Sequence, residues 1–263
     1  MAMNVFQELS LARLPEHRAM LRSRIRMRAL LALPEAPRRA VFRGEARFCS
    51  ICRSRLSRFL PFGNLPDEWC PVCASMGRHR FMWIILQTHT NLLDETPKRL
   101  LHFAPERSLE DALAGVPGLL STTADLYDPH VDDRVDIRSM PYEDSTFDAV
   151  LCSHVLEHVD NDRAAIREIA RVLRPGGWAV IMVPYFDGML TDEDPSITDP
   201  AERERRFGQQ DHVRFYGRDI ADRLADAGLH VQPLRADELL PASRLANEGV
   251  RPEETAFLCT RPG

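Results

Sequence analysis

The amino-acid sequence predicts an α/β protein in which a doubly wound, mostly parallel sheet follows a small unit held together by metal. From residue 98 onward, apolar strand-like runs alternate with helix-like stretches, as in sheets whose helices cover both faces. Before that region, two C-x-x-C pairs stand 17 residues apart. The chain has 263 residues, 44% of them hydrophobic, which suffices for one sizeable core and a small satellite unit.

The front of the chain is basic, although the net charge of −5 does not indicate a nucleic-acid-binding protein. Residues 1–48 hold ten Arg against four Glu, and apolar positions recur at helical spacing over residues 5–33. Such a helix can lie on a membrane surface or on nucleic acid, but more often it docks on its own domain. Residues 1–45 are therefore expected to form a basic helical segment, and a nucleic-acid partner is the less favoured alternative.

Four cysteines are candidate zinc ligands. Each C-x-x-C turn presents two thiolates to one tetrahedral ion, and the metal replaces the core that about 30 residues cannot build. The alternative, buried or redox-active cysteines, is disfavoured by two turns at matching spacing. Four thiolates leave no open position, so the Zn²⁺ would be structural. The expected zinc ribbon spans residues 46–80, with the ligands Cys49, Cys52, Cys70 and Cys73.

Cysteine usage and hydropathy predict a cytoplasmic protein. Cysteine pairs at metal-ligand spacing are typical of reducing compartments, whereas disulfides mark secreted proteins. No apolar run approaches the roughly 18 residues of a membrane span. The N-terminal stretch also contains acidic residues and has no apolar signal-peptide core.

A linking helix is expected over residues 78–95, and the linking segment is assigned to residues 81–97. The alternating region follows it. Strands are expected at 99–104, 119–126, 134–137, 147–155, 178–185, 229–235 and 255–260, and helices at 108–114, 160–173 and 217–227. Ligands of such sheets bind at the carboxyl ends of the strands. One rim would then comprise residues 104–107, 125–128, 136–139 and 153–158.

Two rim residues suggest nucleotide-like binding. Asp125 lies 19 residues after Glu106, about where an acid holds a ribose hydroxyl pair in nucleotide-binding βαβ units. Turn formation is the alternative, because Asp is common at strand ends. Asp136 follows the third, short strand. The first strand ends in "HFAPERS", without the glycines that a pyrophosphate requires.

The stretch "DIRSMPYEDSTFDAVLCSHVLEHVDNDRAAIREIARVLRPGGWAVIMVP" resembles the core of class I S-adenosylmethionine-dependent methyltransferases of the type 11 kind. The resemblance covers about residues 98–235. The cysteine front, "HFAPE" and "DPSITDPAERERRFGQQDHVRFYG" resemble a bacterial subgroup with an N-terminal zinc ribbon. The resemblance implies a Rossmann-like, seven-stranded methyltransferase domain over residues 98–263, with S-adenosyl-L-methionine as methyl donor.

The resemblance also implies which residues hold the donor. The second-strand acid that holds the ribose falls on Asp125, and the pair that flanks the adenine falls on Asp136 and Ile137. The usual first motif, D/E-x-G-x-G-x-G, is absent, but S-adenosylmethionine carries no phosphate, and a carboxylate at Glu106 could pair with its ammonium group. The implied cofactor-binding residues are Ala104, Pro105, Glu106, Asp125, Leu126, Asp136, Ile137, Ser153 and His154.

His154-Val-Leu-Glu157-His158 also matches H-x-x-E-H, the inverted zinc-protease pattern. On one helix, the two histidines would share a face and could bind zinc. A strand directly precedes His154, however, so the two histidines are expected to straddle a strand–helix junction. A protease is therefore disfavoured, while a metal site that uses Glu157 and His158 stays open.

Residues 184–216 are long for a connection and predict a lid-like insertion, with a solvated insertion as the alternative. In the first interpretation, "DHVRFYG" covers an acceptor, and His212 removes its proton as the methyl group leaves. His154 is the competing base. The predicted function is methyl transfer to an unidentified, polar small molecule. The alternative is a degenerate scaffold that uses the zinc ribbon to bind nucleic acid or protein.

Overall fold

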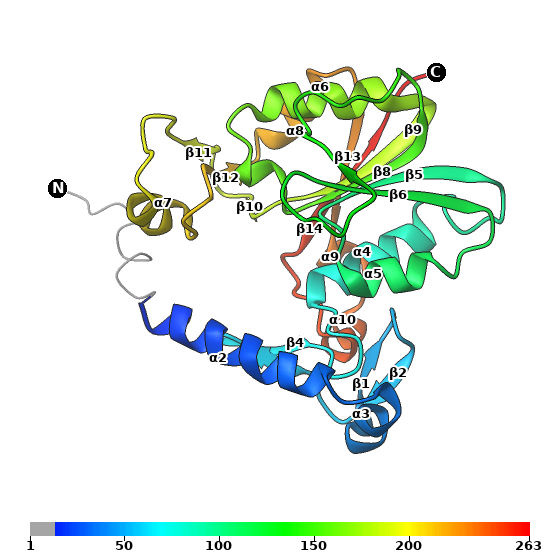
Figure 1. The fold of residues 1–263 in the computed structure, drawn as a ribbon, viewed down its shortest axis with the longest axis vertical. Helices are drawn as coiled ribbons and strands as arrows, with labels where there is room; N and C mark the ends of the chain where they lie inside the picture. Colours follow the sequence, from blue (N-terminus) through cyan, green and yellow to red (C-terminus); the bar gives the residue numbers. More distant parts are fainter. Residues whose placement is uncertain (1–13) are drawn as a thin grey trace. The chain divides into compact units, whose positions relative to one another are not determined.

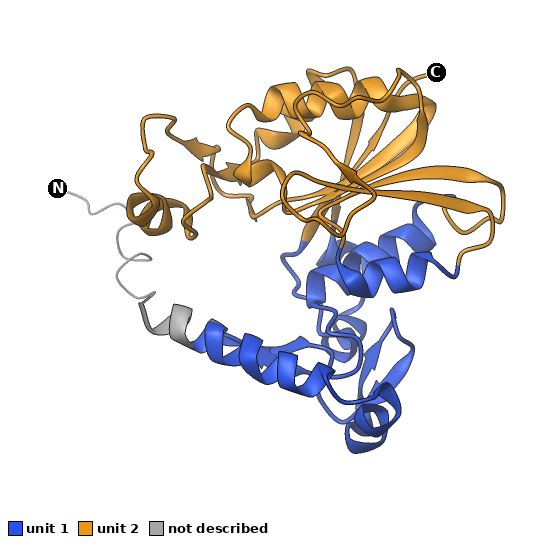
Figure 2. Cartoon of the chain, viewed as in Figure 1, with its two compact units in different colours: residues 1–91, 106–115, 235–254 blue, residues 92–105, 116–234, 255–263 orange. Residues whose placement is uncertain are grey.

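The computed structural model describes residues 14–263, which divide into two compact units (Figures 1 and 2). Unit 1 comprises the chain up to Asn91 together with Glu106–Gly115 and Arg235–Glu254. Unit 2 comprises Leu92–Pro105, Val116–Leu234 and Thr255–Gly263. The part of the expected basic helix that falls on residues 1–13 lies outside the described residues. In the described residues, no helix is both long and apolar enough to cross a membrane.

Unit 1 combines two small antiparallel hairpins with helices. Its helices are α2 (Leu14–Leu31), α3 (Glu35–Val41), α4 (Gly77–Thr88), α5 (Arg107–Leu113), α9 (Ala236–Leu239) and α10 (Ala242–Glu248). One hairpin pairs β1 (Arg43–Cys49) with β2 (Ser54–Leu56), and the other pairs β3 (Leu60–Phe62) with β4 (Leu65–Trp69). Unit 1 also includes two segments that the sequence analysis placed in the methyltransferase domain, residues 106–115 and 235–254.

The interior of unit 1 is organised around Arg80 of α4, whose side chain is fully buried. Its guanidinium lies 4.0 Å from the centre of the Phe59 ring. It donates hydrogen bonds to the carbonyl oxygens of Ser75 (2.8 Å), Glu68 (3.0 Å) and Gly249 (3.1 Å). A buried cation needs such acceptors. Arg80 therefore ties the cysteine-bearing hairpins to the chain that follows α10.

Helix α2 differs from the sequence expectation in the face that it buries. Met27 and Ser23 are buried, and the Ser23 hydroxyl accepts a hydrogen bond from the Gly63 N–H (3.2 Å). Leu21 and Ile25, which the helical spacing marked as apolar contacts, are about 60% exposed (59% and 60%). The helix docks through a narrower stripe than the pattern predicts.

Unit 2 is built on a seven-stranded sheet with the order β13-β14-β9-β8-β5-β6-β7. The pairs β7–β6, β6–β5, β5–β8 and β8–β9 are parallel, and β14 runs antiparallel to β9. This arrangement confirms the predicted mostly parallel, doubly wound sheet. The strands are β5 (Lys98–Phe103), β6 (Leu119–Asp125), β7 (Asp133–Arg134), β8 (Phe147–Ser153), β9 (Leu173–Met182), β13 (His230–Arg235) and β14 (Thr255–Thr260).

The central strands form the core because they are apolar on both faces. Val150, Leu151 and Cys152 of β8 are completely buried, as are Val180 and Ile181 of β9. Continuous burial is the pattern of a parallel sheet that is covered on both sides. Helix α6 (Asp162–Val172) lies along the sheet near α8 (Ile220–Ala225) (Figure 1), and its apolar face joins this core.

Several elements are shorter than predicted. The linking helix ends at Thr88, and the Thr88 hydroxyl donates a hydrogen bond to the Ile84 carbonyl (2.8 Å). The third strand is reduced to β7, because the Asp136 carboxylate accepts the Arg138 N–H (2.9 Å) and forms a turn. The expected helix over residues 217–227 is α8, which begins only at Ile220.

Residues 184–216 fold into ordered elements. They contain β10 (Tyr185–Phe186), β11 (Asp192–Glu193) and α7 (Pro200–Phe207), and they end within β12 (Arg214–Gly217). The three strands form a small sheet in the order β10-β12-β11. The Asp199 carboxylate caps the start of α7 by accepting from the Glu202 N–H (2.9 Å).

Candidate functional site

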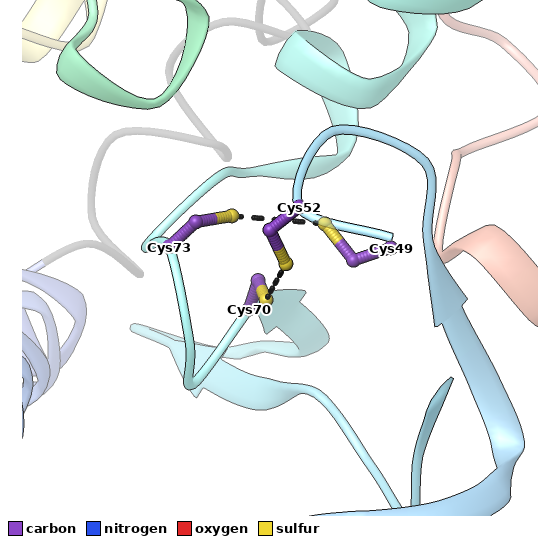
Figure 3. Close-up of side chains that lie close together, drawn as sticks. All are labelled: Cys49, Cys52, Cys70 and Cys73. Carbon is purple, nitrogen blue, oxygen red and sulfur yellow. Dashed lines mark hydrogen bonds between the residues drawn. The ribbon is translucent and has the colours of Figure 1, made fainter. Parts of the chain in front are cut away.

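The four predicted cysteines of unit 1 converge on one point (Figure 3). The Sγ atoms are 3.7 Å apart both for Cys49 and Cys73 and for Cys52 and Cys70, and all four lie within 4.8 Å of one another. Zn–S bonds of about 2.3 Å in a tetrahedron put sulfurs about 3.8 Å apart. All four thiols are free. The cluster therefore fits a closed tetrahedral zinc site.

The backbone of both C-x-x-C turns prepares this cluster. The residue after each pair, Arg53 and Ala74, adopts a left-handed conformation (φ 56° and 60°). The Ala74 N–H donates to the Cys70 carbonyl (2.9 Å), which closes the second turn. The Ser75 hydroxyl lies 3.3 Å from the Cys49 sulfur and 3.2 Å from the Cys73 sulfur. A hydroxyl at this distance can orient metal-bound thiolates.

The predicted donor-binding residues of unit 2 gather at one edge of its sheet. Phe103, the last residue of β5, is in register with Ala124 of β6 and Cys152 of β8. The residues that follow, Ala104, Asp125 and Ser153, therefore leave the three strands at the same level. This is the edge where α/β sheets bind ligands.

Ala104 shows how β5 turns without a glycine. Its φ is 45°, in the left-handed region that favours glycine, and its N–H donates to the Ala124 carbonyl (2.9 Å). Pro105 follows, and its ring fixes its own φ. The turn of the usual first motif is therefore formed by Ala-Pro, at a cost of about 1–2 kcal/mol for the left-handed alanine.

Asp125 ends β6 and is half-buried. Its Oδ1 accepts hydrogen bonds from the N–H groups of Tyr127 (2.7 Å) and Asp128 (2.8 Å). One of the two carboxylate oxygens of Asp125 therefore forms the turn after β6. Turn formation is the alternative role that the sequence left open. Leu126, next in the chain, is 40% exposed.

Asp136 is bound by a neighbouring arginine. The Arg138 guanidinium donates to both carboxylate oxygens of Asp136 (2.7–3.1 Å) and to Asp160 (2.5 Å). The hydrogen bonds from Arg138 hold the pKa of Asp136 below its ordinary value. The adjacent Ile137 is buried in the core.

Glu106 lies in unit 1, at the start of α5. Its Oε1 is 3.3 Å from Nε2 of His79, which is itself buried. His79 accepts the Met76 N–H at Nδ1 (3.2 Å), so Nε2 of the neutral ring carries the proton and faces Glu106. Burial lowers the pKa of His79 despite the attraction of Glu106, so the imidazole is neutral at pH 7. The role of Glu106 toward a donor ammonium stays a prediction.

His154 occupies a strained position directly after β8. Its φ is 54°, and its N–H donates to the Met182 carbonyl at the end of β9 (2.8 Å). Its Nδ1 lies 3.1 Å from Oε1 of Glu157, which is completely buried. Burial opposes ionisation of Glu157, but the hydrogen bond and charge of His154, with smaller effects of His158 and His212, keep its pKa below the ordinary value. The pair forms a carboxylate-oriented imidazole.

His212, the other predicted base, is buried with 3% exposure. Its Nδ1 lies 3.0 Å from the Phe207 carbonyl, and its ring packs edge-on against that of His158 (4.6 Å between centres). Burial lowers the pKa of His212, while the charge of Glu157 opposes this effect. One candidate metal-ligand atom from each of His212, His158 and Glu157 lies within 4.8 Å of the other two. The sequence did not predict that His212 joins this group.

Two polar residues of "DHVRFYG" have an interior role. Arg214 is buried and donates to the carbonyls of Leu156 (2.9 Å) and Asp160 (2.8 Å) and, at close range, of Val159. The Tyr216 hydroxyl donates to Asp162 (2.9 Å). Both side chains hold the chain after β8 in place.

The structure also bears on the H-x-x-E-H pattern. β8 ends at Ser153, and only a short 3₁₀ turn, η1 (Leu156–His158), follows. His154 and His158 therefore straddle a strand–helix junction, as predicted, and do not share the face of an α-helix. The metalloprotease arrangement is not formed.

Comparisons with known proteins relate part of unit 2 to methyltransferases. Residues 124–181 match the methyltransferase domain family. The chain is 36% identical over 88 residues to 27-O-demethylrifamycin SV methyltransferase of Amycolatopsis mediterranei, covering 32% of this chain and 31% of that one. It is 52% identical over 42 residues to demethylmenaquinone methyltransferase of Mycobacterium tuberculosis, covering 16% and 18%. The matches thus span less than a third of these relatives' length.

Among solved structures, the fold is similar to that of 1,6-didemethyltoxoflavin-N1-methyltransferase of Burkholderia thailandensis. The identity is 15% and the TM-score is 0.46, over 71% of this chain and 87% of that one. The matched segment, residues 124–181, holds the end of β6, β7, β8, α6 and most of β9, and it includes Asp125, Asp136 and His154. We conclude that residues 124–181 of this chain are similar to a methyltransferase domain and lie within a Rossmann-like, seven-stranded sheet.

Proposed function

We propose that the protein transfers a methyl group from S-adenosyl-L-methionine to a polar small molecule. The observation that carries the proposal is that Ala104, Asp125 and Ser153 lie at one sheet edge, and that Asp125 and Ser153 fall within the segment that matches the methyltransferase domain family. The reaction is a displacement in which the acceptor attacks the methyl carbon in line as the sulfonium sulfur leaves. Holding the two groups about 3–3.5 Å apart supplies much of the acceleration.

In this proposal, Asp125 holds the ribose of the donor. Its Oδ1 keeps the turn after β6, and Oδ2 accepts a ribose hydroxyl. Leu126 and Ile137 offer apolar contacts to the adenine, with Asp136 beside them. Ser153 and His154 border the sulfonium.

His154 is the favoured proton acceptor. Glu157 fixes its Nδ1, which leaves Nε2 to take a proton from the acceptor. His212 is the alternative base, but its burial and its contact with Phe207 separate it from bulk solvent. We favour His154 because it also follows directly on β8, at the edge that holds the donor.

The zinc ribbon would be structural. Four thiolates at tetrahedral spacing fill the coordination sphere of Zn²⁺, so the ion would stabilise unit 1 and take no part in methyl transfer. Thiolate ligands persist in a reducing compartment, which is consistent with a cytoplasmic location.

Crystals soaked with S-adenosylhomocysteine test the proposed site. Density for the nucleoside is expected beside Asp125, with the homocysteine sulfur near His154. Density at another place on the chain, or none at saturating ligand, would refute the assignment. The alternative of a binding module without methyl transfer receives no support from the family match.

A further inference from the structure

We propose that Glu157, His158 and His212 form a second metal site, separate from the four cysteines, for a divalent transition-metal ion. One candidate ligand atom from each residue lies within 4.8 Å of the other two. Each side chain also has a partner that fixes its orientation. The site stands on these contacts and does not depend on methyl transfer.

His212 has the proton arrangement of a metal ligand. Its Nδ1 lies 3.0 Å from the Phe207 carbonyl, which can only accept, so Nδ1 carries the proton. Nε2 then has its lone pair free. This atom is buried and has no hydrogen-bond partner within residues 14–263. A buried, unprotonated imidazole nitrogen without a donor is what a metal ion would satisfy.

Glu157 offers the second ligand. Its side chain is completely buried, and Oε1 is engaged by His154 (3.1 Å). Oε2 is buried as well and finds no donor in the part of the chain that the structure describes. A carboxylate oxygen left without a donor in the interior destabilises the fold. An ion bound to Oε2 would remove that destabilisation.

His158 completes the set. Its Nδ1 lies 3.2 Å from Oδ2 of Asp211, an arrangement in which a carboxylate orients a metal-binding imidazole. The His158 ring meets that of His212 edge-on. With 34% of its side chain exposed, His158 also provides the side from which an ion can enter.

The backbone holds the two halves of the site together. The Val213 N–H donates to the Glu157 carbonyl (2.9 Å), and Arg214 donates to the Leu156 carbonyl, 58 positions away in the sequence. Residues on both sides of the site are therefore fixed before any ion binds. Such preorganisation lowers the cost of assembling ligands around a metal.

The ligand set selects the ion by class. Two imidazoles and one carboxylate suit Zn²⁺ or Fe²⁺, whereas Mg²⁺ and Ca²⁺ prefer all-oxygen sites. Three protein ligands leave at least one position for water or for an oxygen or nitrogen of a bound molecule. The site thus differs from the cysteine cluster, which has no open position.

Metal counting on the full chain tests the proposal. Wild type, His158→Ala and the control His130→Ala are loaded with Zn²⁺, or with Fe²⁺ without oxygen, then desalted and analysed for metal. His130 is an exposed histidine of unit 2 outside the cluster. Wild type and His130→Ala should carry one ion more per chain than His158→Ala. Equal counts in all three proteins, with either metal, would overturn the proposal.

Affinity gives a graded check. In competition with a chromophoric chelator, Asp211→Asn should weaken binding of this ion by about 10–100-fold, because it removes only the orienting carboxylate. His158→Ala should weaken it further. An unchanged affinity in both variants would contradict the site. His158 and Asp211 are partly exposed, so both variants are expected to fold, and circular dichroism checks this. Neither measurement uses the methyl donor, so its outcome is separate from that of the proposed function.

Discussion

At the scale of single residues, the end of β8 concentrates the candidate chemistry. His154 has a left-handed backbone, yet the hydrogen bond of its N–H to Met182 and the contact with Glu157 hold it in place. Strain of this kind, of order 1–3 kcal/mol, persists where the surroundings fix the residue, and such residues cluster at functional sites. Ala104, at the end of the neighbouring β5, has the same conformation.

Replacing His154 tests its role as base. His154→Ala should lower the rate of methyl transfer at saturating donor by about 10²–10⁴-fold, because a general base acts on the acceptor and its loss is not restored by more donor. The rate is measured as transfer from isotopically labelled S-adenosylmethionine into a small-molecule extract. His212→Ala, assayed in parallel, should have the smaller effect per folded molecule. A larger loss in His212→Ala would assign the base to His212, and small losses in both would mean that no base is needed.

At the scale of elements, the hairpins of unit 1 are expected to depend on their cysteines. Strands β1 to β4 have only three to seven residues each, and units with so little regular structure commonly rely on a metal.

Cys70→Ser should therefore remove zinc and destabilise unit 1. Wild-type protein should contain about one zinc ion per chain at the four cysteines, and the variant should lose it. Elemental analysis measures the loss, and protease sensitivity of the residues before 91 measures the unfolding. The buried Cys259 gives a matched control, Cys259→Ser, which should keep the zinc. A folded Cys70→Ser protein whose metal content equals that of the wild type would contradict the assignment.

The segment over residues 184–216 is fixed to the rest of unit 2 by Arg214. The variant Arg214→Gln leaves the carbonyls of Leu156 and Asp160 and the carboxylate of Glu193 without this donor, and should lower the free energy of unfolding by about 3–5 kcal/mol. Arg205→Gln, in the exposed part of α7, should change it by less than about 0.5 kcal/mol. Urea denaturation compares the two. Equal stabilities would show that the buried contacts of Arg214 do not anchor the segment.

Low pH should weaken the contact between Arg214 and Glu193. Burial by itself would raise the pKa of Glu193, but hydrogen bonds from Arg223 and Arg214 keep it below its ordinary value. A depressed carboxylate pKa stabilises the fold above the unfolded-state value of about 4.3 and ceases to do so as pH falls through the folded-state pKa. Stability should therefore drop less steeply below about pH 4 in Glu193→Gln than in wild type. If the free energy of unfolding fell with pH equally steeply in both proteins, ionisation of Glu193 would not contribute to stability.

At the scale of the whole molecule, local patterns predicted more than long-range ones did. The cysteine cluster and the sheet edge at Asp125 follow from spacing within short segments, because two C-x-x-C turns or a strand end constrain their own geometry. The grouping of Glu157 and His158 with His212 joins segments more than fifty positions apart and depends on how Arg214 docks. Nor does spacing show that Arg214 and Tyr216 point inward, or that residues 235–254 group with unit 1, which holds the four cysteines.

Donor binding is the property of the whole chain on which the proposed function depends. Asp125→Asn keeps an oxygen for the turn but loses the charge, so each hydrogen bond to the ribose should weaken. A hydrogen bond to a charged group contributes about 1.5–3 kcal/mol, and 1.4 kcal/mol corresponds to tenfold in affinity. Asp128→Asn, in the same exposed turn, provides the control.

Isothermal titration calorimetry with S-adenosylmethionine tests this most directly. Wild type and Asp128→Asn are expected to bind one donor per chain with a dissociation constant on the order of micromolar, and Asp125→Asn about tenfold or more weakly. Absence of binding to the folded wild-type protein, or equal affinity in wild type and Asp125→Asn, would contradict the account.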